Sequence, residues 1–118
     1  MSQPVLDPAV VESLRQLTPP GEPDVLKDVL QLFLDDVPGR IERLRAAWQA
    51  GNAVEVQRCA HSLKGSAGNI GASHLLAVCR QLDERGKSGD LSNLPGLVAS
   101  LDAEYARVEA EIARLIGA

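Results

Sequence analysis

The sequence predicts an all-α protein: an antiparallel, up-down-up-down four-helix bundle with a short extra helix at the N-terminus. Apolar residues recur every three or four positions over long runs, which is the spacing of one helix face. No run alternates between polar and apolar residues for long enough to predict a strand. Aromatic residues make up only 3% of the 118 residues, so the core must be aliphatic, which favours packed helices over sheets.

The first predicted helix is short and runs from about Pro8 to Leu17. Asp7 can cap its N-terminus, and a proline such as Pro8 suits the first helical position. We expect residues 1–7 to be flexible. The segment TPPGEP, residues 18–23, predicts a stiff connector to the next helix.

A long helix is predicted next. Its apolar stripe steps by three or four residues and consists of Leu26, Leu30, Phe33, Val37, Ile41, Leu44 and Trp48. Pro38 lies inside this stripe, where a proline removes a backbone hydrogen bond and costs about 3 kcal/mol. Because the stripe keeps its phase across Pro38, we expect a kink and not a break.

Three further helices follow the Gly51–Asn52 turn, in which Asn52 can cap the third helix. Ser73 is expected to cap the fourth helix, and residues 84–90 form the next turn. The predicted core positions are Val56, Cys59, Ala60, Leu63, Ala67 and Ile70 in the third helix, Leu75, Val78, Cys79 and Leu82 in the fourth, and Leu94, Leu97, Leu101, Tyr105, Val108, Ile112 and Leu115 in the last. Short connectors between long helices predict a single domain, 1–118, with a core bundle over 24–116.

Charge and composition argue against several classes of partner. A net charge of -4 is unfavourable for nucleic acid or an anionic membrane as the main partner. No apolar run approaches the roughly 20 residues that span a bilayer, and the first ten residues lack the features of a signal peptide. We therefore expect a cytoplasmic protein, monomeric because its helices already bury their stripes, in which Cys59 and Cys79 are reduced core residues.

Residues 60–72, AHSLKGSAGNIGA, depart from the pattern of good helix formers. On a helical wheel His61 lies about 150° from the centre of the core face, and therefore faces solvent. Lys64 and Gly65, at i+3 and i+4, are its surface neighbours. Each glycine inside a helix costs about 1 kcal/mol relative to alanine, yet Gly65 and Gly68 both fall on this outer face. Small residues there leave His61 accessible to another surface.

This arrangement favours phosphoryl chemistry. An exposed imidazole changes charge near neutral pH, its neutral nitrogen is a nucleophile, and an ammonium group such as that of Lys64 can pair with phosphate oxygens. Two simpler interpretations stay open: the glycines mark a fraying helix end, or His61 is an ordinary solvated side chain. Hydrolysis is less favoured, because it would need a second acid or base near His61, and none is evident in the sequence.

The same segment resembles the signature of histidine phosphotransfer (HPt) domains, in which lysine and glycine follow the histidine at positions +3 and +4. The segment FLDDVPGRIERLRAAWQAGN is similar to the family's preceding helix, LLAVCRQLDERGKSGD to the helix after the site, and LDAEYARVEAEI to the closing helix. The resemblance covers about residues 24–116, and it implies a helical bundle.

In function, the resemblance implies a phosphorelay intermediate without a cofactor or ATP site of its own. Its partners would be the receiver domains of a hybrid histidine kinase and of a response regulator, which supply the magnesium. His61 would accept the phosphoryl group, Lys64 would help to hold it, and Gly65 would keep the site open. Asp83 stands where some members carry a glutamine, and its charge would repel phosphate. The expected docking residues are Val54, Gln57, Arg58, Gly68, Asp83 and Lys87.

Rival interpretations of these residues are weaker. GSAGNIG, residues 65–71, fits neither GxxxxGK[ST] nor GxGxxG, and no strand precedes it. Cys59 and His61 lie about 200° apart on one helix and cannot share a metal ion, so no metal site is predicted. The main alternative is a helical adaptor that binds a signalling partner without phosphotransfer. The intact set of His61, Lys64 and Gly65 favours phosphotransfer.

Overall fold

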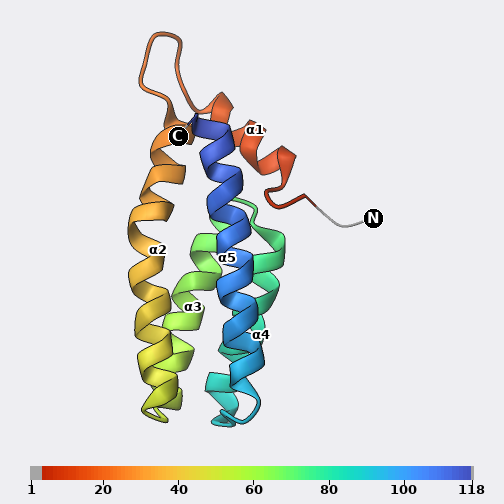
Figure 1. Cartoon of the computed structure of the whole chain (residues 1–118). Coiled ribbons are helices and arrows are strands. Elements are labelled where there is room, and N and C mark those ends of the chain that lie inside the picture. Colours follow the sequence, from red (N-terminus) through yellow and green to blue (C-terminus); the bar gives the residue numbers. More distant parts are fainter. Residues whose placement is uncertain (1–3, 118) are drawn as a thin grey trace.

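The structure is a computed structural model that describes residues 4–117, and it contains five helices and no strand within that range (Figure 1). The predicted all-α fold class is therefore confirmed. The helices are α1 (Pro8–Gln16), α2 (Val25–Gln49), α3 (Ala53–Asn69), α4 (Ser73–Ser88) and α5 (Leu94–Ile116).

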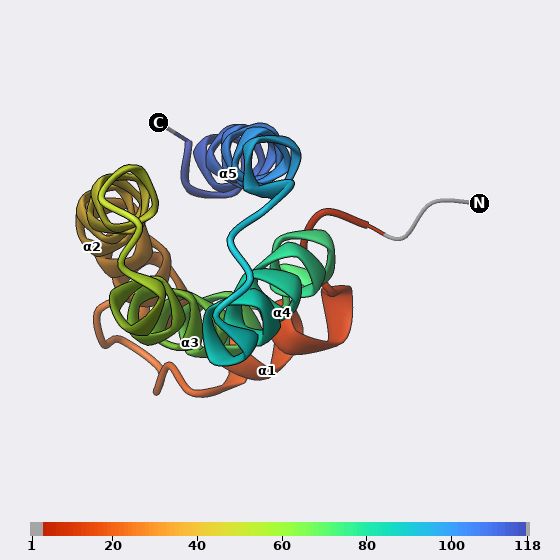
Figure 2. The ribbon, with the colours of Figure 1, turned by 90° about the horizontal axis from the view of Figure 1, so that it is seen from below.

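The four long helices form the predicted up-down-up-down bundle. Successive helices run in opposite directions, and α1 lies across one end of the bundle (Figure 1). Viewed along the bundle, α3 lies between α2 and α4, and α5 closes the side opposite α3 (Figure 2). One face of α3 consequently points away from the rest of the molecule.

The core is almost entirely aliphatic, as the composition predicts. The largest fully buried side chains come from α2, α3, α4 and α5 and from the turn after α3: Leu30, Leu44, Leu63, Ile70, Leu75, Leu82, Leu94, Leu101 and Ile112. Trp48 is half-buried at the end of the predicted α2 stripe, and Ala47 is buried beside it. In α5, Val98 is buried although the predicted stripe did not include it.

The predicted starts of α1 and α3 are confirmed, and at each of them a side chain caps a free backbone amide. Asp7 accepts a hydrogen bond from the Ala9 amide, and Asn52 accepts one from the Glu55 amide. The expectation for Ser73 is wrong: Ser73 is the first residue of α4, and the residue before it, Ala72, occupies the cap position without a side-chain hydrogen bond. Ala72 is fully buried, so core packing and not capping fixes the start of α4.

Helix α2 continues through Pro38 as a single helix, so the prediction that the proline does not break it is confirmed. The ring of Pro38 is exposed on the side of α2 away from the core. Among the residues described here, no helix combines the length and the apolar character needed to cross a membrane.

The segment before α1 differs from the expected flexible end. Leu6 is buried with only 5% of its surface exposed, and the Asp7 amide donates a hydrogen bond of 2.9 Å to the Gly71 carbonyl oxygen. Gly71 has a φ of +71°, and a Cβ on it would lie 2.9 Å from the Asp7 Cβ. A glycine is required there by both the backbone conformation and the close approach. The part of the expectation that concerns residues 1–3 lies outside the described residues.

Candidate functional site

His61 lies on the exposed face of α3, as the helical wheel predicts. Helix α3 extends to Asn69, so Gly65 lies inside the helix and only Gly68 belongs to its last turn. A Cβ placed on Gly65 or Gly68 would meet nothing within 4 Å. Packing within this molecule therefore does not require either glycine, and the interpretation of a fraying end does not apply to Gly65.

Lys64 is held by a buried carboxylate on the neighbouring helix. Its Nζ lies 3.0 Å from Oδ2 of Asp83, and Lys87 Nζ lies 3.6 Å from the same oxygen. The other oxygen, Oδ1, accepts a hydrogen bond of 2.8 Å from Nε2 of Gln57. Asp83 is 3% exposed and is the only charged residue that is buried in the described part of the chain.

These contacts decide the charge of Asp83. Burial alone would raise the pKa of this carboxyl, but the hydrogen bonds from Gln57 and Lys64 and the charges of Lys64 and Lys87 outweigh burial and lower the pKa below its ordinary value. The group is consequently a carboxylate at neutral pH. Lys64 therefore reaches the exposed face already paired with a negative charge.

A glycine on α4 permits this close contact between α3 and α4. Gly86 is buried, and a Cβ on it would lie 2.6 Å from the Cα, Cβ and backbone nitrogen of Gln57. Because real Cβ atoms do not approach a backbone so closely, any larger residue at position 86 must push the two helices apart. Gly86 thus sets the separation at which Gln57 and Lys64 reach Asp83.

On the other side of His61, α2 brings basic groups to the site. Arg40 donates to the Ser62 hydroxyl, and its guanidinium lies 2.8 Å from the carboxylate of Asp36. A groove between α2 and α3 is lined by Arg40, Arg43, Glu55, Arg58, Cys59 and Ser62. The described face around His61 therefore combines cations from three helices.

A second, largely apolar groove lies further along α3. Its lining residues come from α2, α3 and the turn after α3: Val29, Leu32, Phe33, Asp36, Val37, Ser66, Asn69 and Ile70. Leu32 is 67% exposed although it is a large apolar residue. This contribution of α2 was not predicted from the sequence. The available signal was that Val29 and Leu32 are apolar but lie off the core stripe of their helix.

The residues expected to dock a partner fall into three groups. Val54, Arg58, Gly68 and Lys87 are exposed, and Val54 is the other strongly exposed apolar residue near the site, at 66%. Gln57 is half-buried at the edge of the face, as is Lys64, the expected phosphate contact, because α4 packs beside both. Asp83 is buried, which corrects its place in the expected docking surface: it supports Lys64 from beneath.

Other chemistry-bearing groups lie away from His61 or inside the core. Cys59 and Cys79 are buried free thiols, and burial raises the pKa of Cys79 to about 12. Within residues 4–117, no group of three or more histidine, cysteine, aspartate or glutamate side chains could hold a metal ion.

The site thus consists of an exposed histidine, a lysine one turn further along α3 and a helix surface without large side chains. A comparison with known families gives the same interpretation. Residues 28–111 match the Hpt domain family, so the chain belongs to this family. Members of the family act as carriers in histidine phosphotransfer and have no ATP site of their own.

Particular relatives are similar over most of the chain. The crystal structure of histidine-containing phosphotransfer protein B (HptB) from Pseudomonas aeruginosa PAO1 superposes with a TM-score of 0.87 at 34% identity, covering 96% of this chain and 95% of that one. Histidine-containing phosphotransfer proteins 2 and 5 of Arabidopsis thaliana are 26% and 29% identical over 102 and 105 residues. The chain spans 65% of the length of each of these two relatives.

Proposed function

We propose that this protein is a phosphorelay intermediate. His61 accepts a phosphoryl group from an aspartyl phosphate on the receiver domain of a hybrid histidine kinase, and passes it to the receiver domain of a response regulator. The observation that carries this proposal is the exposed His61 on a well-packed helix, with Lys64 one turn away and no side chain on Gly65. The protein then works as a carrier and not as an independent enzyme.

The proposed step conserves charge and atoms. An unprotonated ring nitrogen of His61 attacks phosphorus, an N–P bond forms, and the P–O bond to the aspartyl carboxyl group breaks. The electron pair of that bond leaves with the aspartate as a carboxylate, and the imidazole becomes a phosphorylated imidazolium. The reverse reaction passes the group to another aspartate. The receiver supplies the magnesium, while this chain supplies a positioned nucleophile and the cation of Lys64.

The docking surface for the receiver extends over both sides of His61. Its centre is the part of α3 at Gly65 and Gly68 that carries no side chains. Two exposed apolar side chains flank it: Val54 lies two turns before His61 on α3, and Leu32 of α2 lines a groove with Ser66 of α3. An apolar contact area with a charged rim is typical of specific protein interfaces. Arg58 and Lys87 provide cations at the rim, which suit the acidic phosphorylation site of a receiver.

The test is phosphoryl transfer from labelled ATP, through a panel of hybrid kinases with their receiver domains, to the full chain. A label that is labile in acid and stable in alkali supports a phosphohistidine and identifies the upstream partner. A folded protein that takes no label from any active kinase would favour the helical adaptor. Size-exclusion chromatography of the same preparation tests the expected monomer.

Replacing Lys64 by alanine should slow transfer to His61 by about tenfold without unfolding the bundle. The variant loses the cation that interacts with the phosphoryl oxygens, and a charge-assisted contact of this kind contributes about 1–2 kcal/mol. The measurement is the transfer rate at fixed receiver concentration. Lys27→Ala, an exposed lysine near the start of α2, is the matched control and should transfer at the wild-type rate. Equal rates for both variants would contradict the role of Lys64.

Gly65→Gln should block approach of the receiver and reduce the transfer rate at least about a hundredfold. The glutamine side chain extends into open space next to His61, so the helix itself tolerates it and gains helix propensity. Gly96→Gln on α5 is the control, because that glycine also has nothing within 4 Å and α5 lies on the side of the bundle opposite α3. Wild-type transfer by Gly65→Gln would refute the argument that close approach requires the glycine.

A further inference from the structure

Asp83 is a buried carboxylate with three polar partners, one of which is the cation next to His61. Lys64 contacts Oδ2 at 3.0 Å, Lys87 contacts the same oxygen at 3.6 Å, and Gln57 donates to Oδ1 at 2.8 Å. A phosphoryl group on His61 would attract the same lysine, because Lys64 is one helical turn from the histidine. Two anions would thus compete for one ammonium group.

We propose that Asp83 competes with the phosphoryl group on His61 for Lys64, and thereby sets how readily the protein gives the phosphoryl group away. The inference rests on the proposed function of His61. A lysine that is shared with a carboxylate neutralises less of the phosphoryl charge than a free lysine does. Asp83 therefore keeps the phosphohistidine a good donor. It acts through Lys64 and is a positioning residue, not a catalytic one.

Lys87 makes this exchange possible. Its side chain is 62% exposed, whereas that of Lys64 is 29% exposed, so Lys87 has room to move onto the carboxylate. When Lys64 turns towards the phosphoryl group, Asp83 retains Lys87 and the Gln57 amide. The buried charge is then never left without a partner, a situation that would be strongly unfavourable.

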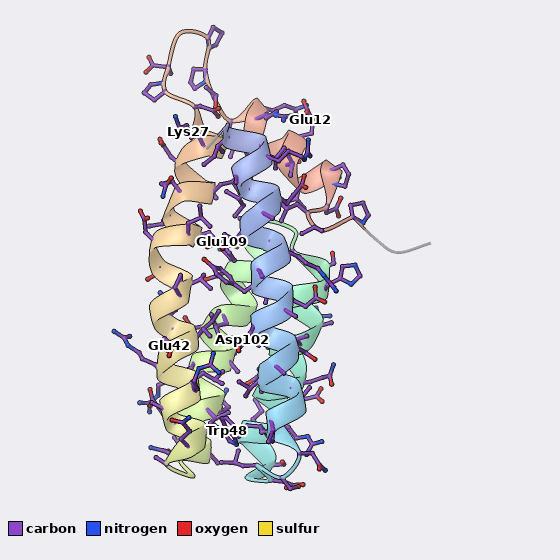
Figure 3. All side chains as sticks on the ribbon, viewed as in Figure 1. Glu12, Lys27, Glu42, Trp48, Asp102 and Glu109 are labelled. Atoms are coloured by element: carbon purple, nitrogen blue, oxygen red, sulfur yellow. The ribbon has the colours of Figure 1, made fainter. Side chains whose placement is uncertain are left out.

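Figure 3 shows a suitable control on another face of the molecule. Asp102 lies on α5, on the side of the bundle opposite α3, and its Oδ1 is 2.7 Å from a guanidinium nitrogen of Arg45 on α2. Asp102→Asn also removes one carboxylate charge from an ion pair between two helices. Because this pair is remote from His61, it reports what such a loss does to the bundle in general.

The experiment measures the equilibrium of phosphoryl exchange between the protein and an isolated receiver domain that labels it, after the kinase has been removed. Asp83→Asn should shift the equilibrium about fivefold towards phosphohistidine, the size expected for one partly exposed ion pair. Asp102→Asn should leave it unchanged. If Asp83 had a purely structural role, Asp83→Asn would behave like Asp102→Asn. Transfer rates and melting temperature would change, but the equilibrium would not shift towards phosphohistidine.

A second substitution tests the route through Lys64. In a Lys64→Gln background, Asp83→Asn should change the equilibrium less than twofold, because no lysine is left to compete for. A full fivefold shift in that background would mean direct repulsion between Asp83 and the phosphoryl group, and would overturn the proposal. An unchanged equilibrium in the Asp83→Asn single variant, with a wild type that is labelled, would overturn it as well.

If the proposed function is wrong, the result is different: the folded wild type itself takes no label from any receiver. That result would overturn both the proposed function and this inference. If Asp83→Asn does not fold, Lys87→Gln replaces it, since that side chain is exposed and its loss leaves the core intact. This variant leaves Asp83 with Lys64 as its only cation and should shift the equilibrium towards the receiver. No shift, or a shift towards phosphohistidine, would overturn the proposal.

Discussion

His61→Gln is expected to lose all phosphoryl acceptance, a fall of at least about a thousandfold, while the bundle stays folded. Glutamine has nearly the polarity and reach of histidine but no nucleophilic nitrogen. Because His61 is exposed, its replacement should change the free energy of unfolding by no more than about 0.5 kcal/mol. The measurements are the acid-labile label after incubation with a phosphorylated receiver, and the melting curve from circular dichroism.

The matched control is His74→Gln, because the described chain contains a second histidine that is half-buried in the first turn of α4. Label on this variant at the wild-type level, together with none on His61→Gln, would assign the phosphohistidine to α3. Label that persists on His61→Gln and disappears from His74→Gln would assign it to α4 and remove the basis of the proposed function.

The helices could be predicted from the sequence because their signals are local. The stripe of α2 steps regularly across Pro38, and caps such as Asn52 form within a few residues of the backbone groups that they satisfy. The exposure of His61 follows from the same periodicity. These properties depend on one helix at a time, so a helical wheel is sufficient to obtain them.

The environment of Asp83 could not be obtained in this way. On the α4 wheel the residue lies at the edge of a core face that includes Cys79 and Leu82, and an acid at such an edge is ordinarily solvated. It is buried because α3 approaches α4 closely at Gly86, a distance between helices that no single-helix pattern contains. Gln57 and Lys64 looked like outer-face residues for the same reason.

The groove beside Leu32 shows a related limit. The core stripe of α2 predicts which residues face inward. The exposed apolar residues of α2 can be assigned to the docking surface only when α2 is known to lie beside the helix that carries His61. Sequence alone gave no reason to place Leu32 near Ser66. Packing, not composition, therefore defines the outer parts of the docking surface.

Gly86→Ala is expected to destabilise the bundle by about 2 kcal/mol and to lower the melting temperature by about 8 °C. The added methyl group would lie 2.6 Å from backbone atoms of Gln57, which no change of rotamer can relieve. The two helices must separate, and this loss exceeds the gain in helix propensity, about 1 kcal/mol, that alanine brings. Gly39→Ala, in open space on α2, is the control and should be slightly stabilising.

The same substitution should also weaken the support of the site. Separation of α3 from α4 lengthens the contacts of Asp83 with Gln57 and Lys64, which now measure 2.8 and 3.0 Å. Nuclear magnetic resonance of the lysine ammonium groups should show Lys64 less ordered in Gly86→Ala than in Gly39→Ala, at a temperature where both are folded. An unchanged Lys64 signal with a lowered melting temperature would show that Gly86 serves stability alone, and that Asp83 holds the lysine over a range of helix separations.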